Sequence, residues 1–142
     1  MKGQASTRVD ATPEAVYDIV SDVTHMGELS PECYRCEWVG GATGPAEGAK
    51  FKGWNRIGRF IKWTTTPEVM VADRGKEFTF KTSQTIWSYT FEEVDGGTIV
   101  TEGFEITSPF TGFYAKLLGR AGALQAGMEQ TLARVKTAAE RA

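Results

Sequence analysis

Three polar residues set among aromatic side chains are the candidates for chemistry in this chain: Glu102, Tyr89 and Asn55. A carboxyl group that points inward among aromatic rings needs a partner or a raised pKa, so Glu102 can act as a general acid or base, or anchor a ligand hydroxyl. Tyr89 can donate its hydroxyl to a ligand carbonyl, or can simply pack as a ring. The structural alternative is a network between Glu102 and a polar neighbour: Asn55, Tyr89, Arg56 or Arg59.

Two cysteines, Cys33 and Cys36, form a C-x-x-C pair, a spacing found in redox motifs and in zinc sites. No second pair completes four zinc ligands, and no strand-to-helix thioredoxin pattern surrounds this one. On the strand expected here, residues three apart point to opposite faces, so the thiols are not expected to bridge. We expect neither a metal nor a cofactor. The one histidine, His25, lies in a short helix and is expected to face water.

A hairpin turn determines which way Glu102 points. Asp95-Gly96-Gly97-Thr98 separates two alternating runs, and glycine tolerates the positive φ that two-residue turns require. Pairing Asp95 with Thr98 places three pairs on one face: Phe91 opposite Glu102, Tyr89 opposite Phe104, and Trp87 opposite Ile106. The other face is polar, as expected for the solvent side of an antiparallel sheet. A one-residue slip would reverse the two faces.

The remaining elements follow from local patterns. Alternation over 5–10 predicts a first strand, and Thr12-Pro13 is a strong helix start because threonine caps an amide and proline has none to leave unpaired. A second short helix is expected over about 24–29, since Pro31 prevents its continuation. Six further strands, divided by Gly, Asp or Pro signals, are predicted over 33–39, 49–57, 60–72, 76–83, 86–94 and 98–107.

From Phe110 onward the hydrophobic period changes from two to 3.6, which predicts one long amphipathic helix across the concave face of the sheet. Arg120 is expected on the far side of this helix, away from the sheet. Gly119, Gly122 and Gly127 interrupt it, and each lowers helix stability by about 1 kcal/mol relative to alanine. They either permit a bend that gates a pocket or allow close packing against a bulky aromatic side chain.

The overall composition is that of an ordinary globular protein, with 142 residues of which 41% are hydrophobic, and a net charge of -2. This charge offers no long-range attraction to nucleic acid or to anionic membranes. No run of about 18 apolar residues occurs, and the chain does not begin with the apolar stretch of a secretory signal. We expect one domain over 1–142, in the cytoplasm, with no nucleic-acid partner and no stable membrane insertion.

Several motifs spread along the chain resemble those of a known family. They are Thr12-Pro13-Glu14-Ala15-Val16-Tyr17-Asp18, Gly48 and Phe51 through Asn55-Arg56, Trp63 with Val69, and Trp87-Ser88-Tyr89-Thr90-Phe91 followed by Gly96-Gly97-Thr98. With the element order, they resemble the START and birch-allergen-like (SRPBCC) superfamily, specifically its bacterial polyketide cyclase/dehydrase and lipid-transport branch. The resemblance implies an α+β helix-grip fold, a curved antiparallel sheet of about seven strands wrapped around a long C-terminal helix. Where the branch typically has Trp-Pro, this chain has Met26-Gly27-Glu28-Leu29.

The resemblance also implies an internal cavity for lipids, sterols, polyketides or plant hormones, but it carries over no catalytic residue. The candidate ligand contacts are Phe51, Asn55, Trp63, Thr65, Phe78, Phe80, Trp87, Tyr89, Phe91, Glu102, Phe104, Phe113, Leu117, Leu124 and Met128. A mostly apolar cleft with a few convergent polar groups is typical of a small-molecule site.

Three functions remain open for this chain. The first is the binding of a small hydrophobic ligand, such as a lipid or a polyketide, by a monomer or weak homodimer. The second is a polyketide aromatase/cyclase-type enzyme in which Glu102, Tyr89 or Asn55 transfers a proton. The third is a non-catalytic regulatory or interaction module whose core is filled.

Overall fold

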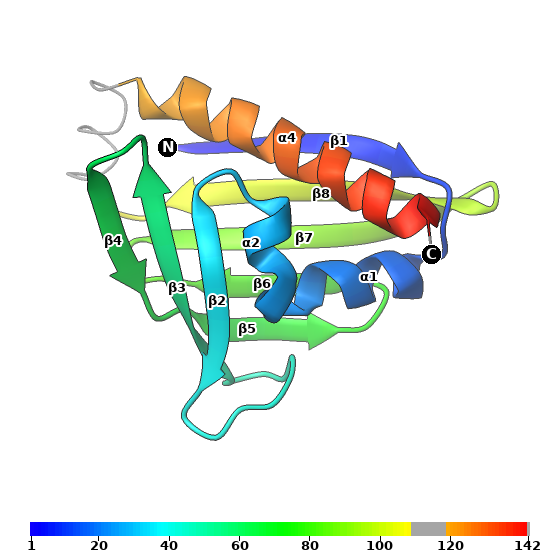
Figure 1. Cartoon of the computed structure of the whole chain (residues 1–142). Helices are drawn as coiled ribbons and strands as arrows, with labels where there is room; N and C mark the ends of the chain where they lie inside the picture. The colour runs from blue at the N-terminus through cyan, green and yellow to red at the C-terminus, as the bar shows by residue number, and fades with distance from the viewer. Residues whose placement is uncertain (109–118, 142) are drawn as a thin grey trace.

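A curved antiparallel sheet with one long helix lying across it forms the computed structural model, which describes residues 1–108 and 119–141 (Figure 1). The strands are β1 (Lys2–Val9), β2 (Cys33–Val39), β3 (Lys50–Ile57), β4 (Ile61–Thr65), β5 (Glu68–Asp73), β6 (Glu77–Lys81), β7 (Thr85–Val94) and β8 (Gly97–Ile106). The helices are α1 (Pro13–Ser21), the 3-10 turn η1 (Val23–His25), α2 (Met26–Leu29) and α4 (Arg120–Arg141). The α+β helix-grip class predicted from the sequence is confirmed.

Seven strands form a continuous antiparallel path in the order β1-β8-β7-β6-β5-β3-β2, and β4 pairs with β3 off this path. The prediction of one strand over 60–72 is wrong, because β4 and β5 are separate strands. Pro67 lies at the break between them and has no amide hydrogen to give to a strand ladder. Its carbonyl instead accepts from the amide of Phe51 at 3.1 Å. The break separates β4 from β5, which pairs with β6.

The β7–β8 hairpin turns on Asp95 and Gly96, so the predicted pairing is wrong by two residues although the predicted faces are correct. Asp95 has a φ of 35° and Gly96 a φ of 79°, and Val94 pairs with Gly97. Asp-Gly is a preferred pair for the centre of a type I′ turn, whereas the prediction placed both glycines there. The resulting pairs are Tyr89 opposite Glu102, Trp87 opposite Phe104, and Phe91 opposite Val100.

Helix α1 begins at Pro13, as the sequence predicted. The Thr12 hydroxyl accepts a hydrogen bond from the amide of Ala15 at 3.2 Å, which satisfies one of the free amides of the first turn. The apolar stripe of the helix buries Val16 and Val20. This stripe packs against β6, β7 and β8 and against α4.

Helix α4 does not extend continuously toward residue 110 as predicted. Gly119 has a φ of 71°, a left-handed value, so the helix begins only at Arg120. The predicted helical stretch 110–118, with Phe113 and Leu117, lies outside the described residues. From Arg120, α4 lies over β1, and its C-terminal end approaches α1 (Figure 1). None of the described helices is both long and apolar enough to cross a membrane.

One end of the concave face is filled with close-packed apolar side chains. This filled end consists of Val9, Val16, Tyr17, Val20, Phe78, Phe91, Val100, Leu132 and Val135, all buried. Tyr17 packs edge-on against Phe78 and Phe91, with ring centroids 6.2 and 5.6 Å apart. Sheet, α1 and α4 all contribute to this end, so it holds the three layers together.

Candidate functional site

The other end of the concave face contains a pocket of about 490 Å³. It lies between the first half of α4, the segment that joins α2 to β2, and strands β2, β3, β4, β6, β7 and β8. Its aromatic lining residues are Phe51, Trp63, Phe80, Trp87 and Tyr89. The other lining residues include Glu32, Cys33, Cys36, Asn55, Thr65, Thr82, Thr85, Glu102, Arg120, Leu124, Met128 and Thr131. We call this the pocket end, and its volume is in the range of small-molecule sites.

Glu102 is buried in the pocket wall with only one of its carboxyl oxygens paired. The side chain is 4% exposed, and its Oε2 accepts a hydrogen bond from the Tyr89 hydroxyl at 2.9 Å. Its Oε1 has no hydrogen-bond partner within the described part of the chain. Burial raises the pKa of Glu102 to about 8, and the Tyr89 hydrogen bond opposes this only in part. At neutral pH Glu102 is therefore mostly a neutral acid, with a proton to donate.

Tyr89 occupies the cross-strand position directly opposite Glu102. It is 3% exposed, and burial, with the nearby Glu102, raises its pKa well above the usual value. Its hydroxyl therefore stays protonated, and the hydrogen is engaged by Glu102. The predicted donation from Tyr89 to a ligand carbonyl is not favoured by this geometry, whereas the structural pairing of Tyr89 with Glu102 is confirmed.

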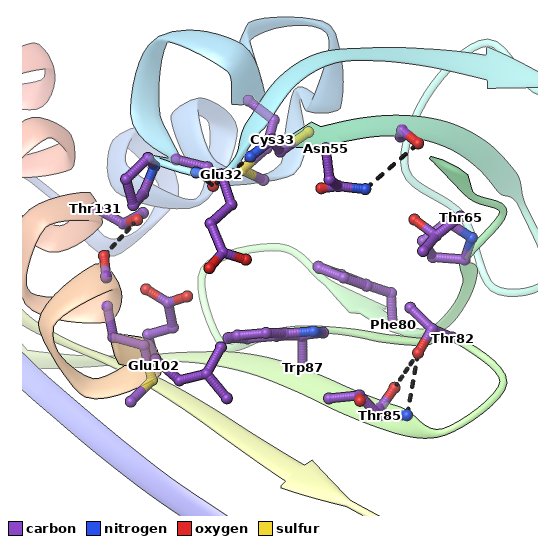
Figure 2. A pocket seen from close by; sticks show the side chains of 18 of the residues that line it. Glu32, Cys33, Asn55, Thr65, Phe80, Thr82, Thr85, Trp87, Glu102 and Thr131 are labelled. Carbon is purple, nitrogen blue, oxygen red and sulfur yellow. Dashed lines mark hydrogen bonds between the residues drawn. The ribbon is translucent and has the colours of Figure 1, made fainter. Parts of the chain in front are cut away.

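Asn55, the third catalytic candidate, lines the pocket across from Glu102 (Figure 2). Its Nδ2 makes only a long hydrogen bond, to the carbonyl of Gly53 at 3.5 Å. Arg56, which was predicted as a possible partner of Glu102, instead lies over the ring of Tyr34, 5.2 Å from the ring centroid. The side chain of Asn55 makes no other hydrogen bond within residues 1–108 and 119–141, so it can orient a ligand.

The predicted ligand contacts divide into three groups. Those that line the pocket are Phe51, Asn55, Trp63, Thr65, Phe80, Trp87, Tyr89, Glu102, Leu124 and Met128. Those that are buried outside the described lining are Phe78, Phe91 and Phe104. The first two of these pack with Tyr17 in the filled end, and Phe104 packs against Trp87. Phe113 and Leu117 lie outside the described residues. Ligand contact itself stays a prediction for the whole set.

An ion pair that the sequence analysis missed joins Glu32 and Arg120 at the pocket. Arg120 donates from Nη1 to Oε1 at 2.8 Å and from Nη2 to Oε2 at 3.1 Å. The placement of Arg120 on the far side of the helix is wrong. Arg120 precedes Leu124 by four residues, so the two share a helix face, and this spacing was the signal for its position. Figure 2 shows the Glu32 carboxylate pointing toward Glu102 across the pocket.

Cys33 and Cys36 also lie in the pocket wall, and their sulfur atoms are 2.9 Å apart. The prediction that their side chains point to opposite faces is wrong, because β2 contains a bulge. Cys33 and Arg35 pair with consecutive residues of β3, which leaves Tyr34 as an extra residue. An extra residue reverses the alternation, so both thiols point to the same side.

The one histidine takes no part in the pocket. The His25 side chain is 59% exposed, and its Nδ1 lies 3.3 Å from an oxygen of Glu28. Among residues 1–108 and 119–141, no group of three or more His, Cys, Asp or Glu side chains is arranged to hold a metal ion.

Comparison with protein families matches residues 1–140 to the family described as polyketide cyclase / dehydrase and lipid transport. Comparison with curated proteins gives no match. The solved Polyketide_cyc-like protein Cgl2372 from Corynebacterium glutamicum is 30% identical, with a TM-score of 0.58, over 99% of this chain and 89% of that chain.

Two further solved structures are under 25% identical and show the fold alone. The protein TTHA0849 from Thermus thermophilus is 19% identical, with a TM-score of 0.72, over 98% of this chain and 97% of that chain. The di-domain ARO/CYC BexL from the BE-7585A biosynthetic pathway is 20% identical, with a TM-score of 0.74. That match covers 99% of this chain and 50% of the di-domain protein.

Proposed function

The chain belongs to the polyketide cyclase / dehydrase and lipid transport family, and from that premise we propose that it binds an apolar, aromatic small molecule through a carbonyl group. The observation that carries the proposal is the Oε1 of Glu102, a buried polar atom in the wall of a pocket that has no hydrogen-bond partner among the described residues. A buried polar group without a partner is costly, so a ligand that supplies one gains binding free energy.

The walls of the pocket favour a flat, apolar ligand. The aromatic rings of Phe80 and Trp87 line the pocket, together with the apolar side chains of Leu124 and Met128 of α4. Aromatic rings stack on one another with ~0.5–1.5 kcal/mol beyond the burial of their surface. Long polar chains are disfavoured because apolar side chains make up most of the lining.

The neutral form of Glu102 favours a hydrogen-bond acceptor on the ligand. With Oε2 accepting from Tyr89, the proton of the acid is available on Oε1. A ketone or quinone oxygen accepts this proton in a hydrogen bond. A carboxylate ligand would instead need a cation, and Arg120 of the pocket lining already pairs with Glu32. An aromatic ketone therefore fits the site better than a fatty acid does.

A matched pair of ligands tests this proposal. We expect 2-acetylanthracene to bind about fivefold to tenfold more tightly than 2-ethylanthracene at about pH 6, since one neutral hydrogen bond contributes ~1 kcal/mol. At about pH 9 Glu102 is ionised, and this preference should vanish or reverse. Quenching of tryptophan fluorescence on titration measures both affinities.

Two variants serve as the control for the titration. Glu102→Gln keeps a hydrogen-bond donor at all pH values, so it should retain the preference for the ketone at both. Glu105→Gln changes an exposed residue of the same strand and should behave as the unchanged protein. Equal affinities at about pH 6 would refute the role of Glu102, and failure to bind either compound would refute the binding function.

Acid–base catalysis of the aromatase/cyclase kind is the second candidate, favoured by the raised pKa of Glu102 to about 8. A group whose pKa lies near the working pH can both remove and return a proton. In a poly-β-ketone, the carboxylate would take a proton from a methylene between two carbonyls, and the resulting enolate carbon would attack a further carbonyl. The acid would then protonate the new alkoxide.

Turnover of a poly-β-ketone thioester to an aromatic product, followed by its absorbance, tests the catalytic candidate. Glu102→Gln should abolish turnover without lowering the melting temperature, and should leave the ketone affinity near that of the unchanged protein. Turnover that survives this change would exclude Glu102 as the catalyst.

No observation favours the third function, a module with a filled core, because the pocket end is open.

A further inference from the structure

The two thiols of the chain meet inside the pocket wall at the start of β2. Cys33 and Cys36 are 9% and 4% exposed, and their sulfur atoms lie 2.9 Å apart. Neither thiol has a role in the proposed ligand site. Both cysteines nevertheless line the pocket, so a small reagent that enters it comes close to them.

The backbone around the thiols holds them in this arrangement. The bulge at Tyr34 turns both side chains to the same side, and α2 packs directly on that bulge. Gly27 allows this close approach, because a Cβ atom at that position would lie 2.4 Å from the Tyr34 carbonyl oxygen. The Ser30 hydroxyl also accepts from the amide of Cys33 at 3.1 Å.

The neighbouring strand leaves the thiols unobstructed. Cys36 pairs with Gly53 of β3, which has no side chain to lie between the sulfurs. Cys33 and Cys36 thus meet one requirement for a short bridge, because both side chains point to the same side and their sulfur atoms are close. The strand pattern alone would have excluded such a bridge.

From this geometry we propose that Cys33 and Cys36 form a dithiol site that reduces an apolar organic hydroperoxide and is itself oxidised to an intrachain disulfide. The sulfur of Cys33 attacks the terminal peroxide oxygen, the O–O bond breaks, and the alkoxide leaves as an alcohol after taking a proton. Cys33 is then a sulfenic acid. The thiol of Cys36 attacks that sulfur, the S–S bond forms, and the hydroxyl leaves with the remaining proton as water. The two thiols lose two electrons, and the hydroperoxide gains them.

The order of the two steps follows from the surroundings of the two sulfurs. The hydrogen bond from Cys36 lowers the pKa of Cys33, and the same contact together with burial raises the pKa of Cys36. The thiolate is the nucleophile in peroxide reduction, so Cys33 reacts first and Cys36 resolves the intermediate. An apolar hydroperoxide is favoured over a polar one because the pocket that leads to the sulfurs is lined mainly by apolar side chains.

The test uses the whole folded chain, reduced and freed of reductant, and cumene hydroperoxide as the probe. After acid quenching, N-ethylmaleimide under denaturing conditions labels every remaining thiol, and mass spectrometry counts the labels. We expect both labels to be lost together, with a chain mass lower by two hydrogen atoms and one peptide pair linked through Cys33 and Cys36. Dithiothreitol should restore both labels.

Two variants separate the roles of the cysteines. Cys36→Ser should stop at the sulfenic acid of Cys33, which dimedone traps, whereas Cys33→Ser should leave Cys36 labelled in the folded protein. Far-ultraviolet circular dichroism checks that each variant is folded, and the unchanged chain alone decides the proposal if either is not. Two labels that persist after peroxide treatment, or oxidation only to interchain dimers, would overturn it.

A denatured sample provides the last control. In guanidinium chloride the same two cysteines lose their fixed arrangement, so the disulfide should form at least about tenfold more slowly at equal peroxide concentration, because orientation accelerates reactions between held groups. Equal rates in the folded and denatured chain would mean that the fold does not build this site. Failure of ketone binding leaves this result unaffected, since the inference does not rest on the ligand proposed above.

Discussion

The two ends of the concave face use the same sheet and the same helix, yet one is filled and the other is hollow. At the filled end, Leu132 and Val135 of α4 meet Val16 and Val20 of α1, so a second helix fills the space above the sheet. At the pocket end the short helix α2 has ended at Leu29, and the chain turns into β2. No described helix fills the space below the first half of α4.

The difference between the ends extends to side-chain chemistry. The filled end is mainly valine, leucine and phenylalanine, and Tyr17 is the one residue of this set with a polar side-chain atom. The pocket end combines aromatic rings with Glu102, two thiols and the Glu32–Arg120 pair. Packing at the filled end supports the fold, so the pocket end can contain a buried acid that by itself destabilises the protein. The two ends should therefore respond differently to the same change.

The largest contrast is expected from one substitution made at each end of α4. Leu132→Ala removes a side chain that is 2% exposed in the filled end and should lower the free energy of unfolding by about 3 kcal/mol. Leu124→Ala, at the half-buried pocket lining, should lower it by only about 1 kcal/mol, since no closed cavity is created. Urea denaturation measures both, and equal losses would mean that the two ends are packed alike.

The next effect is a pH dependence that belongs to the pocket end. The pKa of Glu102 is raised from 4.5 to about 8, so the folded state keeps a proton that the unfolded state has released between these values. Stability therefore falls as pH rises through this window, by about 1.4 kcal/mol per unit, or ~2 kcal/mol from about pH 6 to about pH 7.5. Glu102→Gln should remove this slope, and Glu105→Gln should keep it. Identical slopes in all three proteins would show that Glu102 is not held neutral.

A smaller effect is expected at Tyr89. Tyr89→Phe leaves both carboxyl oxygens of Glu102 without a partner and should cost about 1 kcal/mol of stability at neutral pH. Because the Tyr89 hydrogen bond lowers the pKa of Glu102, its loss should also move the end of the stability slope to higher pH. Tyr34→Phe, at a residue that is 40% exposed, is the matched control and should change neither quantity.

The smallest effect is expected from a glycine on α4 above the pocket. A Cβ added at Gly122 would meet no atom within 4 Å, so Gly122→Ala should raise stability by up to about 1 kcal/mol through helix propensity alone. Stopped-flow binding of 2-acetylanthracene should show unchanged association and dissociation rates. A slower exchange of ligand would instead support the alternative that this glycine lets the helix bend.

Sequence patterns predicted the elements better than the site that they form. Alternation in β7 and β8 correctly placed Glu102 inward, and Thr12-Pro13 correctly marked the start of α1. The pairing of Glu102 with Tyr89 needed the turn type, which depends on whether Asp95 or Gly97 takes a central position. The local preference of Asp-Gly for the centre of a type I′ turn was the signal that decides between them.

The thiol pair was beyond the reach of sequence patterns for a different reason. The spacing of Cys33 and Cys36 places them on opposite faces of any regular strand. Their meeting depends on the bulge at Tyr34, and the bulge fits against the backbone of Gly27 in another element. Contacts between elements, rather than local propensity, therefore determine how the two thiols are arranged in the pocket wall.

The most direct test of the contrast between the two ends is a map of methyl chemical shifts by NMR during titration with 2-acetylanthracene. Resonances of Leu124 and Met128 at the pocket end should shift in a saturable manner, while those of Val100 and Val135 at the filled end should not. Shifts at both ends alike, or saturable shifts at neither, would contradict the account that one end is built for stability and the other for a ligand.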